Sequence, residues 1–168
     1  DAWLRSAAIR RALGDLDGAS AMLSQAARML PSSSVVARTR LAMLEAQGEV
    51  EAAAAIARGE IDKGAEGASA ASLWLRVAEA AAIANDRVGA LDALHKALAA
   101  DPRCIPARAI ELDLLSDGED PAALASSLEA MAEAFTTDAA KSRAFMLGAY
   151  AWSCLAKDAQ AAKAALSQ

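Results

Sequence analysis

Two stretches of this chain carry the same distinctive residues at a constant offset. Trp3 and Trp74 lie 71 residues apart, and Pro31 and Pro102 are separated by the same distance. A tryptophan and a proline that return in the same order indicate an internal repeat, which constrains a fold more strongly than composition does. Because the two tryptophans share a repeat position, we expect both side chains to pack between helices.

Turn residues divide the interval between the two stretches. Gly14 is followed 34 residues later by Gly48 and, after a further 37 residues, by Asn85. Glycine and asparagine are the residues that most readily adopt the left-handed backbone of a turn. The spacing predicts a unit of about 34 residues with a turn near its middle, so 168 residues hold about five units.

Composition indicates which element fills each unit. The chain contains 49 alanines, while aromatic residues make up 4% of it. Alanine is the strongest helix former because it loses no side-chain entropy, and its small side chain lets helices approach closely. The low content of aromatic and β-branched residues argues against a sheet. The sequence therefore predicts an all-α protein.

The first unit resembles the tetratricopeptide repeat (TPR). That pattern has a bulky residue near its start, a small residue four positions later, a Gly-acid turn, and a second helix that opens with alanine and ends at proline. The matching residues are Trp3, Ala7, Gly14, Asp15, Ala19, Leu23, Ala26 and Pro31. The third unit repeats the pattern with Trp74, Ala78, Asn85, Asp86, Ala90, Leu94, Ala97 and Pro102. The resemblance implies an α-solenoid, a right-handed superhelix of about five antiparallel helical hairpins.

The resemblance covers essentially the whole chain. We expect one TPR-like repeat domain over residues 1–168, with units at about 1–33, 34–70, 71–104, 105–137 and 138–168. Pro106 and Pro121 stand where proline is tolerated, in the first turn of a helix, and are predicted to start the two helices of the fourth unit. The chain starts without methionine and stops within a helical pattern, so we expect it to be a segment of a longer protein.

The second unit departs from the pattern. Gly59, Gly64 and Gly67 fall within nine residues, and no proline closes the unit. Each glycine costs a helix interior about 1 kcal/mol relative to alanine, so we expect the second helix here to be short or broken. The segment is interpreted as a longer loop between units or, alternatively, as a bend in the stack.

Residues able to perform catalysis are scarce. His95 is the only histidine, and no serine or cysteine arrangement supplies a nucleophile with an adjacent base. We interpret His95 as a solvated residue on an outer face. No enzymatic activity and no cofactor are expected.

Acidic residues are densest near the middle of the fourth unit. They are Glu111, Asp113, Asp117, Glu119 and Asp120. A calcium site is conceivable because hard cations bind carboxylate oxygens, but the spacing does not match an EF-hand loop. We interpret the stretch as a solvated turn in which Asp120 caps the next helix, and we expect no metal.

Arginines concentrate on the expected first helices of the hairpins, which line the concave face of the TPR architecture. They are Arg5, Arg10, Arg11, Arg38, Arg40, Arg76, Arg108 and Arg143. A guanidinium group holds a carboxylate through paired hydrogen bonds, so a basic groove would suit an acidic or C-terminal peptide. Alternatively, several of these arginines pair with neighbouring acids along the flanks of the helices.

The resemblance also implies which residues face the groove. The candidate peptide-binding residues are Leu4, Ala8, Arg11, Arg38, Ala42, Glu45, Leu75, Arg76 and Glu79. Some relatives grip a terminal carboxylate with a lysine–asparagine clamp, and Leu4 and Ala8 stand at its first two positions. Recognition of that kind is therefore disfavoured.

These features predict a scaffold that binds a peptide or helix of a partner protein, with an acidic partner among the candidates. A self-associating spacer that forms a homodimer and the regulatory recruiting arm of a larger enzyme are alternatives. The net charge of −5 argues against nucleic acid, and no apolar run approaches the ~20 residues of a membrane-spanning helix. The compartment stays open, with the cytoplasm favoured over the periplasm.

Overall fold

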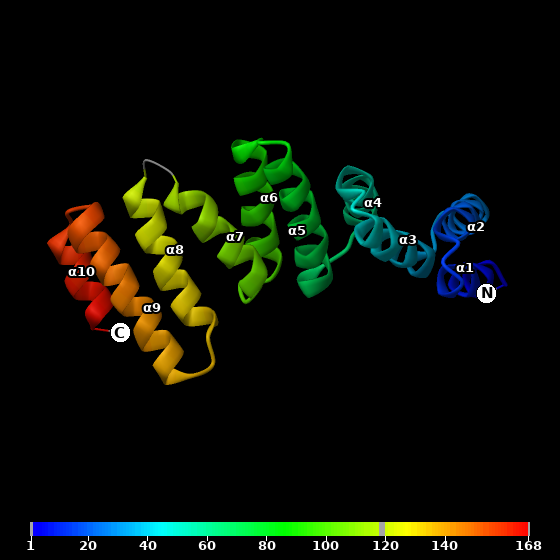
Figure 1. Cartoon of the computed structure of the whole chain (residues 1–168). Helices are drawn as coiled ribbons and strands as arrows, with labels where there is room; N and C mark the ends of the chain where they lie inside the picture. The colour runs from blue at the N-terminus through cyan, green and yellow to red at the C-terminus, as the bar shows by residue number, and fades with distance from the viewer. Residues whose placement is uncertain (1, 118–119, 168) are drawn as a thin grey trace. The chain divides into compact units, whose positions relative to one another are not determined.

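The computed structural model describes residues 2–117 and 120–167, and all regular structure in these ranges is helical. The helices are α1 (Ala2–Ala12), α2 (Leu16–Met29), α3 (Ser34–Gln47), α4 (Val50–Asp62), α5 (Gly67–Ile83), α6 (Arg87–Ala100), α7 (Ile105–Ser116), α8 (Pro121–Ala134), α9 (Asp138–Tyr150), the short π-helix η1 (Ala151–Leu155) and α10 (Ala159–Leu166). Figure 1 shows them as consecutive helical hairpins. The all-α prediction is confirmed.

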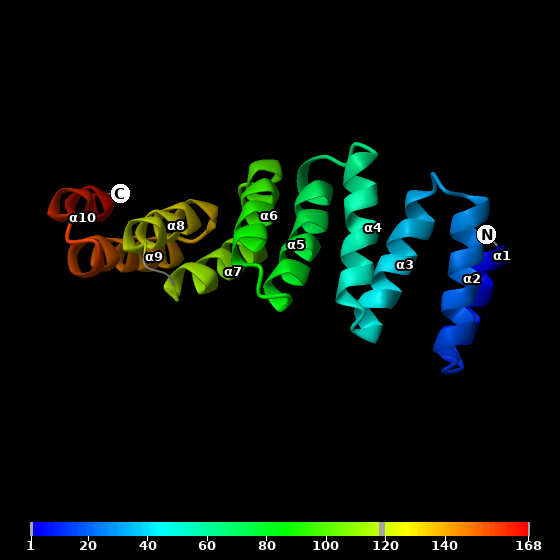
Figure 2. The ribbon, with the colours of Figure 1, turned by 90° about the horizontal axis from the view of Figure 1, so that it is seen from above.

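Contacts between helices group the chain into two compact units. The first, Asp1–Ala65, holds α1 to α4, and the second, Glu66–Gln168, holds α5 to α10. Within each unit every helix packs on the next one along the chain, as α3 and α4 or α8 and α9 do in Figure 2. The helix pairs fall within the expected repeat units, except that α5 begins at Gly67, before the expected boundary at residue 71. The single repeat domain stays a prediction.

The same left-handed turn follows the first helix of three hairpins. Gly14, Gly48 and Asn85 have φ angles of 80°, 74° and 58°. In all three turns the N–H of the next residue donates to a carbonyl of the preceding helix at 2.9 Å. This backbone conformation favours glycine and tolerates asparagine. The spacing of these residues in the sequence thus has a conformational cause.

Aspartate side chains cap α2, α6 and α8, whereas Glu49, at the start of α4, makes no side-chain cap. Asp15, Asp86 and Asp120 each accept a hydrogen bond at 2.9 Å from the backbone N–H three residues later. Gly18 and Gly89 supply that N–H in the first and third hairpins, where a Cβ atom would collide with the capping carboxylate. The bond from Gly18 lowers the pKa of Asp15 below its ordinary value. The predicted capping role of Asp120 is confirmed.

Small residues form the core at equivalent repeat positions. Ala19 and Ala90 are both 0% exposed, and Leu23 and Leu94 are 2% and 0% exposed. The other buried equivalents are Ala7 with Ala78 and Ala26 with Ala97. Alanine at a helix contact permits a close approach of the two backbones, and the leucines then fill the remaining space. The pattern behind the TPR resemblance is therefore a pattern of burial.

The two tryptophans differ in their surroundings. Trp74 on α5 is half-buried, and Lys96 Nζ lies 4.8 Å from the centroid of its ring. Trp3 on α1 is 37% exposed, so most of its surface is covered, and the expectation that it packs between helices stays a prediction. Helix α1 packs on α2, whereas α5 contacts α6 and α7.

The glycines of the second hairpin do not interrupt its second helix. Helix α4 runs unbroken for 13 residues through Gly59, so the expectation of a short or broken helix is wrong. Three buried alanines of α4 offset the roughly 1 kcal/mol that one glycine costs. Gly64 and Gly67 belong to the connection to α5 and its first residue, where their φ angles of 90° and 56° favour glycine.

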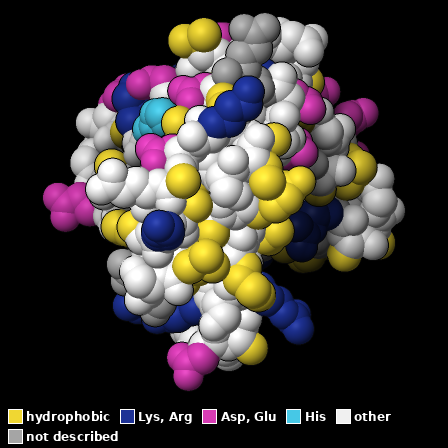
Figure 3. All heavy atoms as spheres, turned by 90° about the vertical axis from the view of Figure 1, so that its left-hand side faces the viewer, with side chains coloured by type: hydrophobic (Ala, Val, Ile, Leu, Met, Phe, Trp, Pro, Cys, Tyr) yellow, Lys and Arg dark blue, Asp and Glu magenta, His cyan; other side chains and the backbone are white. Residues whose placement is uncertain are grey.

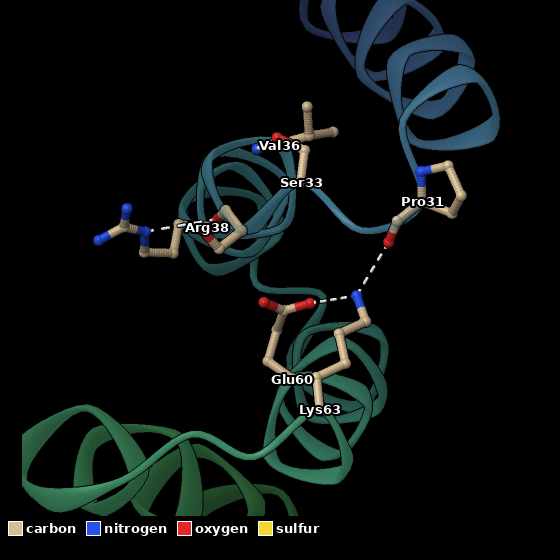
Figure 4. A network of polar contacts seen from close by, with 7 residues as sticks. Pro31, Ser33, Val36, Arg38, Glu60 and Lys63 are labelled. Carbon is tan, nitrogen blue, oxygen red and sulfur yellow. Dashed lines mark hydrogen bonds and ion pairs between the residues drawn. The ribbon is translucent and has the colours of Figure 1, made fainter.

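Lys63 ties the end of α4 to the connection between α2 and α3. Its Nζ donates to the Pro31 carbonyl at 3.0 Å and to Glu60 Oε1 at 2.5 Å (Figure 4). At the start of α3, the Ser33 hydroxyl accepts a hydrogen bond from the backbone N–H of a residue three positions later. Arg38 points away from this network in Figure 4, and its side chain is exposed.

Candidate functional site

The predicted groove residues on α1 divide between core and surface. Ala8 and Arg11 are exposed. Leu4 is half-buried and packs against the core cluster of Ala7, Ala19, Leu23 and Met43. Ala8 and Arg11 are thus accessible on the surface of α1, while Leu4 packs into the core cluster.

The predicted groove residues on α3 form an exposed stripe. Arg38, Ala42 and Glu45 recur at the spacing of four and three residues that places side chains on one face of a helix. All three are exposed. Arg38 Nε donates to the Ser34 carbonyl of its own helix at 3.4 Å, a long bond that an incoming acceptor could replace.

The predicted groove residues on α5 are less accessible. Leu75 and Arg76 are half-buried, and Glu79 is exposed. Arg76 Nη1 donates to the carbonyl of Ser72 at 2.6 Å and to its hydroxyl at 2.7 Å. The guanidinium group of Arg76 is therefore held along its own helix.

Two of the arginines on first helices follow the alternative interpretation and pair with nearby acids. Arg10 Nη1 lies 2.6 Å from Asp15 Oδ2 in a solvent-exposed pair, and pairs of this kind add little to stability. Arg108 Nη1 lies 2.6 Å from Glu111 Oε2, and both of these side chains are largely buried. Arg108 therefore belongs to a second site, away from the predicted groove residues.

The second site is a cavity of about 680 Å³ among α6, α7 and α8 of the second unit. Its lining residues are Arg87, Leu91, His95, Arg108, Glu111, Leu115, Asp120, Ala123, Ser126, Ser127 and Ala130. None of the nine predicted groove residues lines it. Its volume is within the range of about 300–1,000 Å³ that is typical of ligand pockets.

Glu111 is the centre of this cavity's polar groups. It is 3% exposed, so the interpretation of Glu111 as part of a solvated turn is wrong. Its Oε2 accepts hydrogen bonds from Arg108 Nη1 and from the Ser127 hydroxyl, and its Oε1 lies 3.2 Å from His95 Nε2. A buried carboxylate is tolerated only when such partners replace its water. Three helices supply them here.

The remaining predictions about ionisable residues have mixed outcomes. The side chain of His95 is 66% exposed, as expected for a solvated histidine, but its Nε2 also faces Glu111. Asp113 and Asp117 are exposed, and Glu119 lies outside the described residues. Among residues 2–117 and 120–167, no three His, Cys, Asp or Glu side chains come together as metal ligands.

The sequence alone predicts which lining residues share a helix face, but not which helices meet at the cavity. Arg108 and Glu111 are three residues apart, which places them on one face of α7, and Arg87, Leu91 and His95 share one face of α6 by the same logic. No sequence spacing relates α8 to these faces. The convergence of Ser127 on Glu111 comes from the packing of α7 on α8.

The helical hairpins, their left-handed turns and their alanine contacts define a TPR solenoid fold. Among solved structures, two crystal structures of MamA superpose with TM-scores of 0.69 and 0.67 at 14% sequence identity. They cover 98% and 96% of this chain, and this chain covers 86% and 90% of theirs. YrrB, described as a TPR protein with an unusual peptide-binding site, has a TM-score of 0.64 at 15% identity, with 98% of this chain and 81% of YrrB covered.

No protein-family model and no curated protein sequence matches the chain. At such low sequence identity the superpositions establish the fold, which agrees with the TPR resemblance of the sequence, and do not establish a shared ligand. In the part of the chain that the structure describes, no helix combines the length and the apolar character that crossing a membrane requires.

Proposed function

We propose that this chain is a non-catalytic scaffold that binds a peptide or helix of a partner protein through the concave groove of the TPR fold. The binding residues are the predicted ones on the first helices of the hairpins: Leu4, Ala8, Arg11, Arg38, Ala42, Glu45, Leu75, Arg76 and Glu79. The arginines favour an acidic partner, because a guanidinium group binds a carboxylate through two parallel hydrogen bonds.

The exposed stripe of Arg38, Ala42 and Glu45 on α3 is the observation that carries this proposal. The small side chain of Ala42 leaves room for a partner backbone. The charged side chains of Arg38 and Glu45 on either side of it would fix the position of that backbone along α3. The helix is already formed, so ordering it adds little to the entropic cost of binding. YrrB, with the same fold, has a peptide-binding site, which supports a similar use here.

The double variant Arg38→Glu with Arg76→Glu tests the groove. Charge reversal at both positions should lower capture of a partner protein in pull-downs by tenfold or more, since each lost charge-assisted hydrogen bond contributes about 1.5–3 kcal/mol. Arg28→Glu with Arg103→Glu, at two exposed positions outside the stripe, is the matched control. Helicity by circular dichroism should be the same in all three proteins. Equal capture by the groove variant and the wild type would contradict the proposal.

Self-association is a second candidate function, and one observation favours it. Large apolar side chains are exposed on the last hairpin: Met146, Leu147, Tyr150, Leu155 and Leu166. Figure 3 shows hydrophobic side chains gathered on this end of the chain, over α9 and α10. Repeat proteins cover the apolar flank of each hairpin with a neighbour, so a second copy of the chain could occupy this face.

A further inference from the structure

We propose that the cavity among α6, α7 and α8 is a second binding site, which receives an acidic segment of a partner protein. This site shares no residue with the predicted groove and does not depend on it. We name it the Glu111 pocket, after the buried carboxylate at its centre, and define it by the eleven lining residues given above.

The Glu111 pocket is rigid at its polar end because one carboxylate joins three helices. Arg108 of α7, Ser127 of α8 and His95 of α6 all contact the Glu111 carboxylate. A polar group whose partners come from separate elements holds those elements in one arrangement. The pocket is therefore formed before a ligand arrives, which lowers the entropic cost of binding.

Hydrogen-bond donors outnumber acceptors in the Glu111 pocket. Glu111 Oε2 accepts from Arg108 Nη1 and from the Ser127 hydroxyl, Glu111 Oε1 lies 3.2 Å from His95 Nε2, and Asp120 Oδ1 accepts from the backbone N–H of Ala123. A guanidinium group carries five N–H donors. Arg87 uses one of its donors, from Nη2 to the Leu114 carbonyl, and Arg108 uses one on Glu111.

The unused donors determine the chemistry of the ligand. Within the described residues, Arg108 Nε is buried without a hydrogen-bond partner, so Glu111 does not saturate this guanidinium group. The half-buried Arg87 also lines the cavity, and the Leu114 carbonyl occupies one of its N–H donors. A carboxylate is the group that satisfies such donors in pairs, while an ammonium or guanidinium ligand would add further donors.

The remaining walls favour an acidic segment of a protein over a small polyanion. Leu91, Leu115, Ala123 and Ala130 give the cavity apolar surface between its polar groups. A chain that alternates carboxylates with aliphatic side chains can match both kinds of surface, whereas a compact polyanion matches only the donors. The charge complementarity of Arg87 and the apolar walls together point to a peptide with glutamate and leucine.

Fluorescence polarisation with the full chain tests the assignment. The probe is a fluorescein-labelled octapeptide of alternating glutamate and leucine, and its matched control has glutamine in place of each glutamate. We expect the glutamate peptide to bind at least tenfold more tightly than the glutamine peptide. Arg87→Gln should weaken binding of the glutamate peptide by tenfold or more, while Arg103→Gln, the same change at an exposed position outside the pocket, should leave it within twofold.

Backbone amide NMR of the wild-type chain locates the peptide without any variant. Shifts on addition of peptide should concentrate in α6, α7 and α8, and the groove variant Arg38→Glu with Arg76→Glu should show the same shifts. Shifts confined to α1, α3 and α5 would overturn the pocket assignment and support the groove instead. Equal affinity for the glutamine and glutamate peptides would overturn recognition of carboxylates. Displacement of the glutamate peptide by an equal concentration of glutarate would overturn a protein segment as the ligand and indicate a small acid instead.

Discussion

At the scale of the residue, Glu111 connects three helices of the second unit. Its carboxylate is nearly inaccessible to solvent and bridges side chains from α6, α7 and α8. Removal of one partner from a buried ion pair leaves the other charge desolvated and uncompensated, which costs more than the pair itself contributes. Glu111 should therefore matter for stability as well as for the pocket.

Glu111→Ala should destabilise the chain by about 3 kcal/mol, because Arg108 and Ser127 lose their acceptor in a buried setting. Asp113→Ala, on the exposed side of the same helix, should change stability by no more than about 0.5 kcal/mol. Urea denaturation followed by circular dichroism measures both. If the two variants unfold at the same urea concentration, Glu111 has no structural role.

At the scale of the element, the left-handed turn is the feature that repeats. Asn85 occupies in the third hairpin the place of Gly14 and Gly48 in the first two, and all three have positive φ angles. A residue with a Cβ atom pays for this conformation in steric energy, which asparagine reduces through local hydrogen bonding of its side chain. The turn position is thus under conformational constraint in every unit where it is described.

Asn85→Ala should destabilise the second unit by about 1 kcal/mol, since alanine has no polar side chain to support a left-handed backbone. Asn85→Gly, which installs the residue of the other two turns, should be within about 0.5 kcal/mol of the wild type or more stable than it. Thermal unfolding by circular dichroism distinguishes the two variants. An equal loss in both would show that the side chain of Asn85, and not its backbone angle, is what matters.

At the scale of the whole molecule, the balance of exposed and covered apolar surface decides the assembly. Helices α9 and α10 expose Met146, Leu147, Tyr150 and Leu166, and α1 and α2 also expose large apolar side chains, among them Ile9, Leu16 and Met29. Burial of such a side chain in an interface contributes about 1.5–3 kcal/mol. The self-association proposed above uses the apolar face of the last hairpin.

Leu147→Glu with Leu166→Glu should abolish a dimer formed through α9 and α10, because two charges would enter an apolar contact. Light scattering at several concentrations should give a mass that rises above 17.2 kDa for the wild type. The mass of the variant should stay at 17.2 kDa at every concentration. Val88→Glu, at an exposed apolar residue of α6, is the matched control and should behave as the wild type. A wild type that is monomeric at every concentration would rule out the self-associating spacer.

The sequence by itself determined the local features of this protein: helix content, the positions of the turns and the cap at Asp120. These features depend on residues within one or two helical turns of each other, such as Gly14 with Asp15 and Gly18. Nine groove candidates also came from the sequence, through the TPR resemblance, and their role in binding stays a prediction. The same reasoning identified Asp120 as a cap and missed the Glu111 pocket a few residues away.

Only the tertiary structure decided which side chains are buried. Lys96 lies over the ring of Trp74 although 22 residues separate them in the sequence. Gly59 is tolerated in α4 because neighbouring alanines are buried, and Glu111 is buried because α6 and α8 bring His95 and Ser127 to it. Burial and charge pairing depend on helices distant in the sequence, whereas caps and turns depend on adjacent residues, and this difference in range separates what the sequence shows from what packing adds.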